Sequence, residues 1–201
     1  MAGEHYFTAQ PAALAHRRSL EVELAGRRLA VVTAGGVFSP DRVDTGTRVL
    51  FREAPAPPQE GTFLDLGCGW GPIALTLGLL SPTATVYAVD VNERALELTR
   101  ANAVAAGLEH VHAVNADGVP PDVRFDLVWS NPPIRVGKHA LHELLGTWLP
   151  RLGPDGVAYL VVQKNLGADS LQRWLRESLG MPCERYAVSK GYRVLRVSRA
   201  G

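Results

Sequence analysis

Apolar residues follow two alternating patterns along the chain from about residue 61 onward. Short apolar runs are typical of buried strands, and longer stretches with apolar residues three or four positions apart are typical of helices. Short runs predict seven strands, at 62–66, 85–90, 111–116, 125–130, 156–163, 183–189 and 192–198. The longer stretches between them predict helices at 71–80, 92–107, 138–149 and 168–180. Because strands alternate with helices, we expect an α/β fold with a doubly wound, mainly parallel seven-stranded sheet.

Turn and cap residues support these boundaries. The last two strands meet at Lys190-Gly191, a short polar turn that predicts an antiparallel C-terminal hairpin at the edge of the sheet. The helix at 92–107 begins with Asn92, whose side chain can cap the first turn. It ends at Gly107, which can adopt the left-handed conformation that often follows a helix.

The first 60 residues show a different pattern and are expected to form a small extension that packs on the main domain, residues 61–201. Alternating apolar and polar residues on either side of Ala25-Gly26 predict a hairpin. A loop at 35–40 and a short helix at 45–53 should follow it. The segment APAPPQEG marks the boundary with the main domain, because proline and glycine interrupt regular structure.

Length and composition exclude several classes of protein. A chain of 201 residues can form one α/β domain with a full core. It has no apolar run of about 18 residues that could span a membrane, and its N-terminus lacks the basic region and apolar core of a secretory signal. We therefore expect a cytoplasmic protein. Cys68 and Cys183 do not pair in a ligand-like motif, so we expect no metal site.

The first strand of the main domain ends in the glycine-rich sequence LDLGCGWG. Gly67, Gly69 and Gly71 would let the backbone approach a ligand closely, with the next helix directing its N-terminus toward that ligand. Pro72 stands where the dinucleotide pattern G-x-G-x-x-G requires glycine. A carboxylate at Asp65 would repel a pyrophosphate but could hold an ammonium group. Asp65 could instead cap the amide groups of its own loop.

Two further acidic residues follow the next two strands. Asp90 ends the strand at 85–90, where a carboxylate can accept hydrogen bonds from both hydroxyls of a ribose; it could also cap the next helix. Asp117 follows the third strand, where it could accept from an adenine amino group or only form a turn. An ammonium group, a ribose and an adenine without a required phosphate describe S-adenosylmethionine.

The sequence SNPPI ends the fourth strand, at the same carboxyl edge. Two prolines exclude a helix and cannot continue an inner strand. The side-chain carbonyl of Asn131 and the main-chain carbonyl of Pro132, which has no role in a strand ladder, could both accept hydrogen bonds from one –NH2 group. This grip would localise the nitrogen lone pair for in-line attack on a sulfonium methyl, by positioning and electrostatics alone. Alternatively, the prolines only end the strand.

With these motifs the sequence resembles the class I methyltransferases of the methyltransferase small family, which includes ribosomal RNA guanine-N2 methyltransferases. DLGCGWG resembles motif I of these enzymes, VDVN their ribose-binding motif, NAD their adenine motif and SNPPI their amino-methyltransferase motif. GVFSPDRVDTGTRVL resembles the entry segment of the family, and the ending KGYRVLRV resembles a single-domain subgroup.

The resemblance implies a Rossmann-like class I methyltransferase fold with S-adenosyl-L-methionine as cofactor. The residues at the matching motifs would bind this cofactor: Asp65, Gly67, Gly69, Gly71, Asp90, Val91, Asp117 and Asn131. Those of the SNPPI motif would form the catalytic site: Asn131, Pro132, Pro133 and Ile134.

Ile134 departs from the pattern of many amino-methyltransferases, which carry an aromatic residue after NPP to stack on a flipped base or clamp an amide. Isoleucine can pack on a base but has no π-system. We expect Phe38, Arg135 or His139 to stack on the substrate instead. The larger rRNA enzymes also carry a second domain for substrate recognition, to which nothing in this sequence corresponds.

Basic residues are concentrated at the C-terminus, although the net charge of +1 identifies no partner. They could protect an edge strand or contact phosphates. Arg193 and Arg196, together with Arg17 and Arg18 of the extension, are our candidates for contact with RNA. Strand alternation should place Arg193 and Arg196 on opposite faces, so that only one of them can reach the same RNA.

These features together predict an S-adenosylmethionine-dependent N-methyltransferase. The predicted substrate is the exocyclic N2 amine of a guanine in ribosomal RNA, either as free RNA or within a ribosomal subunit, in rRNA processing. Two alternatives stay open. One is methylation of a protein glutamine amide, although enzymes of that kind typically carry Tyr after NPP. The other is an RNA-binding relative without catalytic activity. The sequence does not indicate an oligomeric state.

Overall fold

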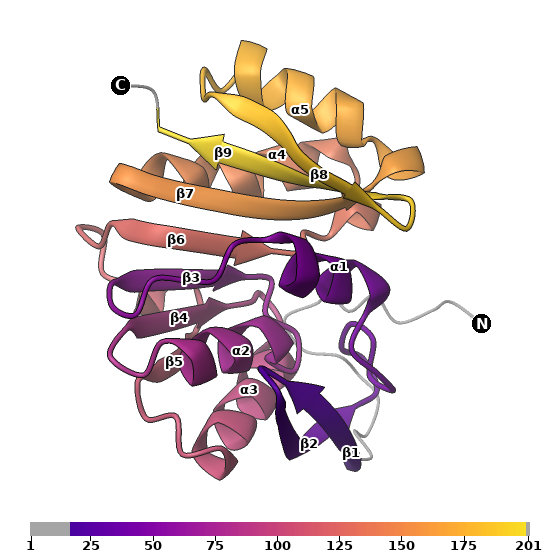
Figure 1. Ribbon diagram of the computed structural model, residues 1–201, viewed down its shortest axis with the longest axis vertical. Helices are drawn as coiled ribbons and strands as arrows, with labels where there is room; N and C mark the ends of the chain where they lie inside the picture. The colour runs from indigo at the N-terminus through magenta and orange to yellow at the C-terminus, as the bar shows by residue number, and fades with distance from the viewer. Residues whose placement is uncertain (1–16, 200–201) are drawn as a thin grey trace.

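The computed structural model describes residues 17–199, except for the side chain of Arg135. The first 16 residues of the predicted extension lie outside this range. A seven-stranded sheet forms the centre of the described part, with helices on both faces and a separate two-stranded hairpin beside it (Figure 1).

The elements occur in the predicted order. The hairpin is β1 (Arg17–Leu24) and β2 (Arg27–Ala34), and the sheet comprises β3 (Thr62–Leu66), β4 (Thr85–Val89), β5 (Val111–Val114), β6 (Phe125–Ser130), β7 (Leu152–Gln163), β8 (Cys183–Ser189) and β9 (Tyr192–Ser198). The helices are α1 (Thr45–Glu53), α2 (Pro72–Leu80), α3 (Glu93–Ala105), α4 (Lys138–Trp148) and α5 (Ala168–Glu177). Short 3-10 turns follow β5, β6, α4 and β7, at η1 (Ala116–Gly118), η2 (Ile134–Val136), η3 (Leu149–Arg151) and η4 (Lys164–Leu166).

The strand order of the sheet is β5-β4-β3-β6-β7-β9-β8. Strands β3 to β7 are parallel, whereas β9 runs antiparallel to both β7 and β8. The predicted seven-stranded, mainly parallel sheet with an antiparallel C-terminal hairpin is therefore confirmed. The chain moves outward from β3 to β5 and then returns to place β6 on the other side of β3. Ligands of open α/β sheets bind at the carboxyl edge of such a switch point.

Two apolar cores lie on the two faces of the sheet. On one face, α1, α2, α3 and the β1–β2 hairpin bury residues such as Leu50, Leu75 and Leu96 against the strands. On the other, α4 and α5 bury residues such as Leu145 and Leu175. Because side chains alternate along a strand, the same strands feed both cores.

One buried side chain, Asn102 of α3, hydrogen-bonds the N-terminal hairpin to the sheet domain. Asn102 of α3 accepts a hydrogen bond from the Val32 amide at 2.7 Å and donates to the Val32 carbonyl at 2.9 Å, as a neighbouring strand would. It also donates to the carbonyl of Trp70, beside the glycine loop, at 2.9 Å. The hairpin and the loop that follows it are thus held close to the glycine loop.

None of the helices within residues 17–199 is long and apolar enough to cross a membrane. Over the same residues, no group of three or more His, Cys, Asp or Glu side chains could hold a metal ion.

Strand β7 begins at Leu152, four residues before the predicted start at Gly156. The register between β6 and β7 shifts here. The two strands approach so closely that a Cβ atom on Gly156 would lie 2.3 Å from the Phe125 carbonyl oxygen. Since that atom is backbone, it cannot move aside, and only glycine fits this irregular pairing.

We expect Gly156→Ala to destabilise the fold by overpacking, by about 1–3 kcal/mol or a loss of about 2–12 °C in Tm. Thermal unfolding followed by circular dichroism measures this change. Gly146→Ala is the matched control, because a Cβ atom at Gly146 in α4 would meet nothing within 4 Å. Equal Tm values for the two variants would show that the strand pair can relax around the added methyl group.

Candidate active site

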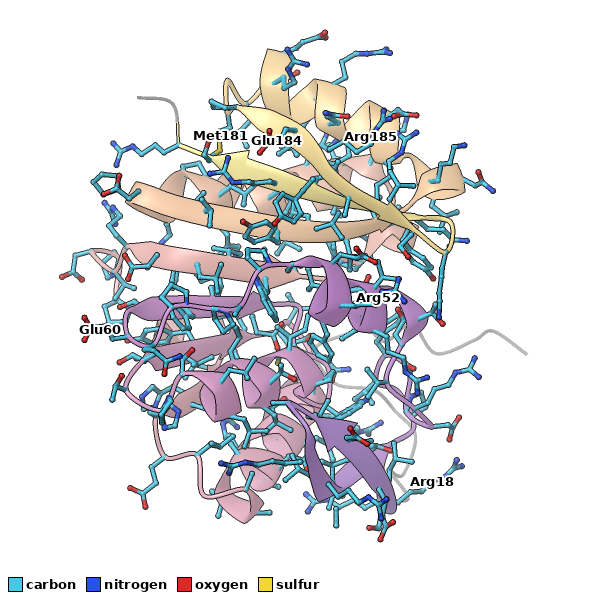
Figure 2. The ribbon with its side chains drawn as sticks, viewed as in Figure 1. Arg18, Arg52, Glu60, Met181, Glu184 and Arg185 are labelled. Carbon is cyan, nitrogen blue, oxygen red and sulfur yellow. The ribbon has the colours of Figure 1, made fainter. Side chains whose placement is uncertain are left out.

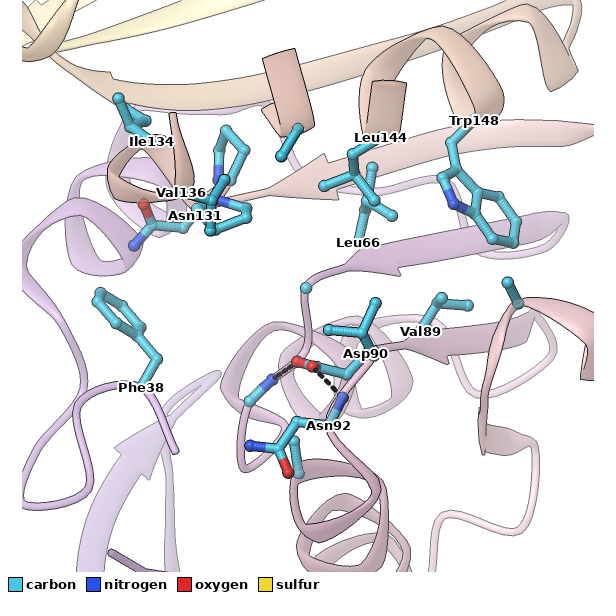
Figure 3. Close-up of a pocket in the computed structure, with 18 of the residues that line it drawn as sticks. Phe38, Leu66, Val89, Asp90, Asn92, Asn131, Ile134, Val136, Leu144 and Trp148 are labelled. Atoms are coloured by element: carbon cyan, nitrogen blue, oxygen red, sulfur yellow. Dashed lines mark hydrogen bonds between the residues drawn. The ribbon is translucent and has the colours of Figure 1, made fainter. Parts of the chain in front are cut away.

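A cavity of about 880 Å³ lies at the carboxyl edge of the sheet, where β3 and β6 diverge (Figure 3). Its walls come from the glycine loop, the ends of β4 and β5, the SNPPI segment, α4, the loop after β2 and the start of α1. This volume lies within the range of cofactor and small-molecule sites. The cavity therefore joins the N-terminal extension and the main sheet in one site.

Two of the three loop glycines line the cavity. Gly67 and Gly69 adopt φ angles of 82° and 59°, which disfavour a side chain. A Cβ atom on Gly67 would point into the space between the loop and the SNPPI segment, 3.9 Å from Pro133 Cδ. Gly71 has a different role: its φ is 97°, and a Cβ atom there would lie 3.0 Å from the Thr99 side chain of α3. The first two glycines thus keep the ligand space open, and the third permits close helix packing.

Asp65 lies beneath the loop and does not line the cavity. It is fully buried, and its Oδ2 accepts a hydrogen bond from the Ala74 amide in the first turn of α2 at 2.9 Å. Burial raises the pKa of Asp65 well above its ordinary value. The capping alternative is therefore the role that the structure shows, and a direct cofactor contact stays a prediction.

Asp90 does line the cavity, with its carboxylate already held in place. Its Oδ2 accepts from the Gly69 amide at 3.0 Å and its Oδ1 from the Asn92 amide at 2.9 Å (Figure 3). Each oxygen keeps further lone pairs with which to accept from a ribose hydroxyl. Asn92, as predicted, caps α3 by accepting from the Arg94 amide, so Asp90 is not the cap residue.

The end of the cavity beside β4 and β5 is mainly apolar. Val91 is 56% exposed and lines it, as does Asp117 in η1. Figure 3 shows Val89, Leu144 and Trp148 around this part of the cavity. Apolar side chains with the Asp117 carboxylate among the lining residues are consistent with the predicted adenine contact. Leu144 and Trp148 were not predicted as site residues, because in the sequence they belong to the apolar pattern of α4.

Asn131 projects from the end of β6 toward the start of α1. Its Nδ2 donates to Asp44 Oδ2 at 2.8 Å and to Thr47 Oγ1 at 3.1 Å. The side-chain carbonyl oxygen of Asn131 makes no hydrogen bond to the described residues, and Asn131 lines the cavity. This arrangement offers an acceptor to a bound amine. Asp44 and Thr47 were not predicted as site residues; the only signal was their place in the entry-segment motif.

The prolines form a tight turn rather than a free extended end. Pro133 has φ −73° and ψ 76°, values typical of an inverse γ-turn, and the Ile134 amide donates to the Pro132 carbonyl at 2.8 Å. The Pro132 carbonyl thus has a turn partner that was not predicted, and one of its two lone pairs remains. Ile134 lines the cavity and packs partly against the core beneath α4.

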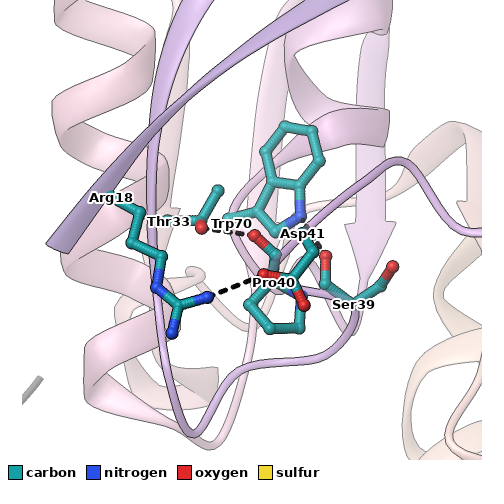
Figure 4. Close-up of polar contacts among 6 residues, drawn as sticks. All are labelled: Arg18, Thr33, Ser39, Pro40, Asp41 and Trp70. Atoms are coloured by element: carbon teal, nitrogen blue, oxygen red, sulfur yellow. Dashed lines mark hydrogen bonds and ion pairs between the residues drawn. The ribbon is translucent and has the colours of Figure 1, made fainter. Parts of the chain in front are cut away.

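Phe38 lies across the same opening from Asn131 (Figure 3), and its side chain is 40% exposed. The loop that carries it is held by two contacts just after Phe38 (Figure 4). The indole of Trp70 donates to the Ser39 carbonyl at 3.1 Å, and Arg18 pairs with Asp41 at 2.9 Å. The ring is therefore presented from a fixed backbone, which fits its expected contact with substrate.

The two other stacking candidates were His139 and Arg135. His139 does not line the cavity; its exposed ring pairs with Glu143 one turn further along α4, at 3.2 Å. The side chain of Arg135 lies outside the described part of the chain.

The arginines of the C-terminal hairpin lie on opposite faces of β9, as predicted. Arg193 is buried beneath α5 and forms an ion pair with Asp169, so the prediction that it contacts phosphate is wrong. The sequence pattern did not show that α5 covers this face. Arg196 pairs at 3.2 Å with Glu184 of the edge strand β8; Glu184 is labelled in Figure 2. It lies about 13 Å along β9 from Tyr192, which lines the cavity.

Arg17 and Arg18 of the N-terminal hairpin are exposed but also paired with acids. Arg17 lies 3.8 Å from Glu97 and Arg18 lies 2.9 Å from Asp41. Figure 2 shows Arg18 at the outer end of the hairpin. Their contact with RNA stays a prediction.

The strand order and the cavity at the β3–β6 switch point together define a class I methyltransferase fold. The sequence model of the Methyltransferase small domain matches residues 28–196. The chain therefore belongs to the methyltransferase small family. The prediction of an S-adenosylmethionine-dependent methyltransferase is confirmed, with S-adenosylmethionine as its cofactor.

Similar proteins cover the chain to different extents. It is 34% identical over 177 residues to the uncharacterized protein YbxB of Bacillus subtilis, covering 87% of this chain and 88% of that protein. It is 34% identical over 194 residues to the ribosomal RNA small subunit methyltransferase C of Pseudomonas aeruginosa, covering 94% of this chain and 56% of that protein. The chain thus spans about half the length of that relative.

A solved structure shares the fold over nearly the whole chain. It is the T. thermophilus 16S rRNA N2 methyltransferase RsmC in complex with AdoMet and guanosine, with a TM-score of 0.77 and 24% identity. The match covers 96% of this chain and 53% of that one.

Proposed function

We propose that this protein transfers a methyl group from S-adenosylmethionine to the exocyclic N2 amine of a guanine in ribosomal RNA. The observation that carries the proposal is the orientation of Asn131, whose amide nitrogen is engaged by α1 and whose carbonyl oxygen is left for a donor in the cavity. The name of the Pseudomonas aeruginosa relative supports ribosomal RNA as the substrate, and the guanosine bound to the structural neighbour supports guanine as the target.

The residues of the chain act by holding the amine. When bound, S-adenosylmethionine supplies a methyl group activated by its sulfonium. The Asn131 carbonyl oxygen and the remaining lone pair on the Pro132 carbonyl each accept a hydrogen bond from one N–H group of the substrate amine. Asn131 and Pro132 thereby localise the nitrogen lone pair and orient it for in-line attack, for which bound S-adenosylmethionine would supply the methyl carbon and its sulfur the leaving group. The nitrogen then releases a proton to water.

A guanine must leave its helical stack to enter the cavity, and aromatic rings commonly receive such a base. Phe38 and Ile134 both line the part of the cavity that contains Asn131. We propose that the base lies between them, with the aromatic face on Phe38 in place of the residue that usually follows NPP.

Labelled methyl transfer tests the proposed function. The protein is incubated with methyl-labelled S-adenosylmethionine and, separately, with free rRNA, ribosomal subunits or total protein from cells lacking the enzyme. We expect label in RNA, recovered as N2-methylguanosine after digestion to nucleosides. Label in protein glutamine would replace the RNA proposal with the amide alternative. No transfer to any fraction would favour a relative without catalytic activity.

Three exposed lysines are better placed for phosphate contact than the hairpin arginines. Lys164 and Lys190 are neighbours at the carboxyl edge, where the Lys164 amide donates to the Gly191 carbonyl at 2.8 Å, and Lys138 begins α4 after the SNPPI segment. None of the three is ion-paired with any residue of the described range. We propose that they hold the RNA backbone around the cavity.

The double variant Lys164→Ala/Lys190→Ala should flatten the dependence of log K for RNA on log salt by about one to two units, because fewer counterions are released. Affinity for S-adenosylmethionine should not change. Titrations with rRNA across a salt series measure the slope. Arg27→Ala/Arg28→Ala is the matched control. It removes the same charge from the start of β2, and neither arginine lines the cavity. Slopes that fall equally in both variants would refute a specific role for the lysines.

A further inference from the structure

We propose that Asp44 and Thr47 are positioning residues that fix the orientation of the Asn131 amide and so turn it into an amine acceptor. The proposal rests on the proposed N-methyl transfer, but not on whether the amine belongs to RNA or to protein. It assigns a function to the DTGT sequence at the start of α1, which lies in the N-terminal extension rather than in the sheet domain.

The two ends of a primary amide differ in what they offer, since the nitrogen only donates and the oxygen only accepts. The Asn131 nitrogen lies 2.8 Å from Asp44 Oδ2 and 3.1 Å from Thr47 Oγ1. A reversed amide would bring its carbonyl oxygen against the Asp44 carboxylate oxygen, where neither group can donate. The carboxylate therefore selects the orientation in which the Asn131 oxygen is left for the cavity.

Asp44 is itself held rigidly. The same Oδ2 accepts from the Gly46 amide at 2.6 Å and caps α1, so the helix start and the Asn131 amide share one acceptor atom. Thr47 is only 3% exposed, and α1 packs across β7 and β9 through buried Val49 and Leu50. The position of the Asn131 amide is thus coupled to the apolar core.

Gly46 provides the space for this arrangement. A Cβ atom there would lie 2.9 Å from Asp44 Oδ2, 3.2 Å from Asn131 Nδ2 and 3.0 Å from the ring of Tyr192. Any larger residue would press on the hydrogen bond between Asp44 and Asn131. In the DTGT sequence, Asp44 thus supplies a fixed acceptor, Gly46 the free space and Thr47 a second acceptor. Together they orient the Asn131 amide.

A double-mutant cycle tests whether Asp44 acts through Asn131. Asp44→Ala should lower kcat by about 10- to 100-fold, the effect of a lost charge-assisted hydrogen bond and a loosened reacting group. In an Asn131→Ala background, the same change should lower kcat by less than about twofold, since groups that act as a unit are not additive. Effects that multiply would show that Asp44 acts independently of Asn131 and would overturn the proposal.

Since Asp44→Ala also removes a helix cap, two milder comparisons separate positioning from folding. Asp44→Asn keeps a carbonyl oxygen that can accept from both amide groups, and it should recover most of the activity. Thr47→Val leaves the cap intact and should lower kcat by about threefold, while Thr47→Ser, which keeps the hydroxyl, should match the wild type. If Val and Ser give equal kcat values at position 47, the role of the hydroxyl is refuted.

The side-chain amide signals of Asn131 provide a test that needs no substrate. In nitrogen-15 spectra of the full chain, these signals are identified by their loss in Asn131→Ala. They should shift in Thr47→Val and in Asp44→Asn, while the side-chain signals of exposed Asn165 stay in place. Unchanged Asn131 signals would overturn the positioning role even if the wild type methylates RNA. Shifted signals in an enzyme that methylates no amine would instead refute only the proposed function.

Discussion

Replacing Asn131 by alanine should lower kcat by about 100-fold or more, the scale measured when one preorganised hydrogen-bonding group is removed from a reacting centre. The variant removes the side-chain acceptor and leaves only the Pro132 carbonyl, which already accepts from the Ile134 amide. Because this contact is made to the reacting amine, kcat and kcat/KM should fall together. Affinity for S-adenosylmethionine, measured by calorimetry, should change by less than about twofold.

Two further variants sharpen this prediction. Asn131→Asp keeps an acceptor oxygen but places a carboxylate against Asp44, so like charges should displace it and leave the variant nearly inactive. Asn165→Ala, at an exposed position in η4, should behave like the wild type. Normal single-turnover rates in Asn131→Ala on the true substrate would mean that the SNPPI segment only ends β6.

Local patterns predicted most of the fold because the apolar patterns and cap residues of most segments favour the same elements that the folded chain forms. The bounds of α1, β3 and β6 agree with prediction to the residue, and Asn92 caps α3 as expected. The start of β7 was missed because Gly153 and Gly156 have the composition of a turn. The requirement for glycine at position 156 comes from the Phe125 carbonyl of another strand, which no local pattern contains.

One rule predicted part of the candidate site: the carboxyl ends of parallel strands meet at one edge of the sheet. That rule brings Asp90, Asp117 and Asn131 to the same cavity. The rule does not show how deeply a side chain is buried. It therefore could not distinguish Asp90, which lines the cavity, from Asp65, which lies beneath the glycine loop.

The same rule does not predict side-chain contacts between residues that are far apart in the sequence. The residues that orient Asn131 lie 87 and 84 positions earlier in the chain. The burial of Arg193 similarly depends on α5, which covers one face of β9. The residue types suggested an amine acceptor at Asn131 and a phosphate contact at Arg193. Which of their atoms a ligand can reach depends on tertiary packing, which the local sequence does not show.

Replacing Asp90 by alanine should weaken binding of S-adenosylmethionine by about 10- to 100-fold, as expected for the loss of charge-assisted hydrogen bonds to two ribose hydroxyls. The glycine loop should also loosen, because the Gly69 amide loses its acceptor. Asp155→Ala, at an exposed position in β7, is the matched control and should bind normally. Calorimetry on folded variants, verified by their Tm, measures the difference.

The pH dependence of the same binding gives a second, sharper test. Burial raises the pKa of Asp90 above its ordinary value of 3.8, although hydrogen bonds from Gly69 and Asn92 oppose the shift. The ribose hydroxyls need the deprotonated form, so affinity should be full above the raised pKa and fall as the pH drops through it, at less acidic pH than for an ordinary aspartate. Asp90→Asn cannot titrate and should lose this dependence. If wild type and Asp90→Asn share one pH profile, another group controls cofactor binding and Asp90 does not hold the ribose.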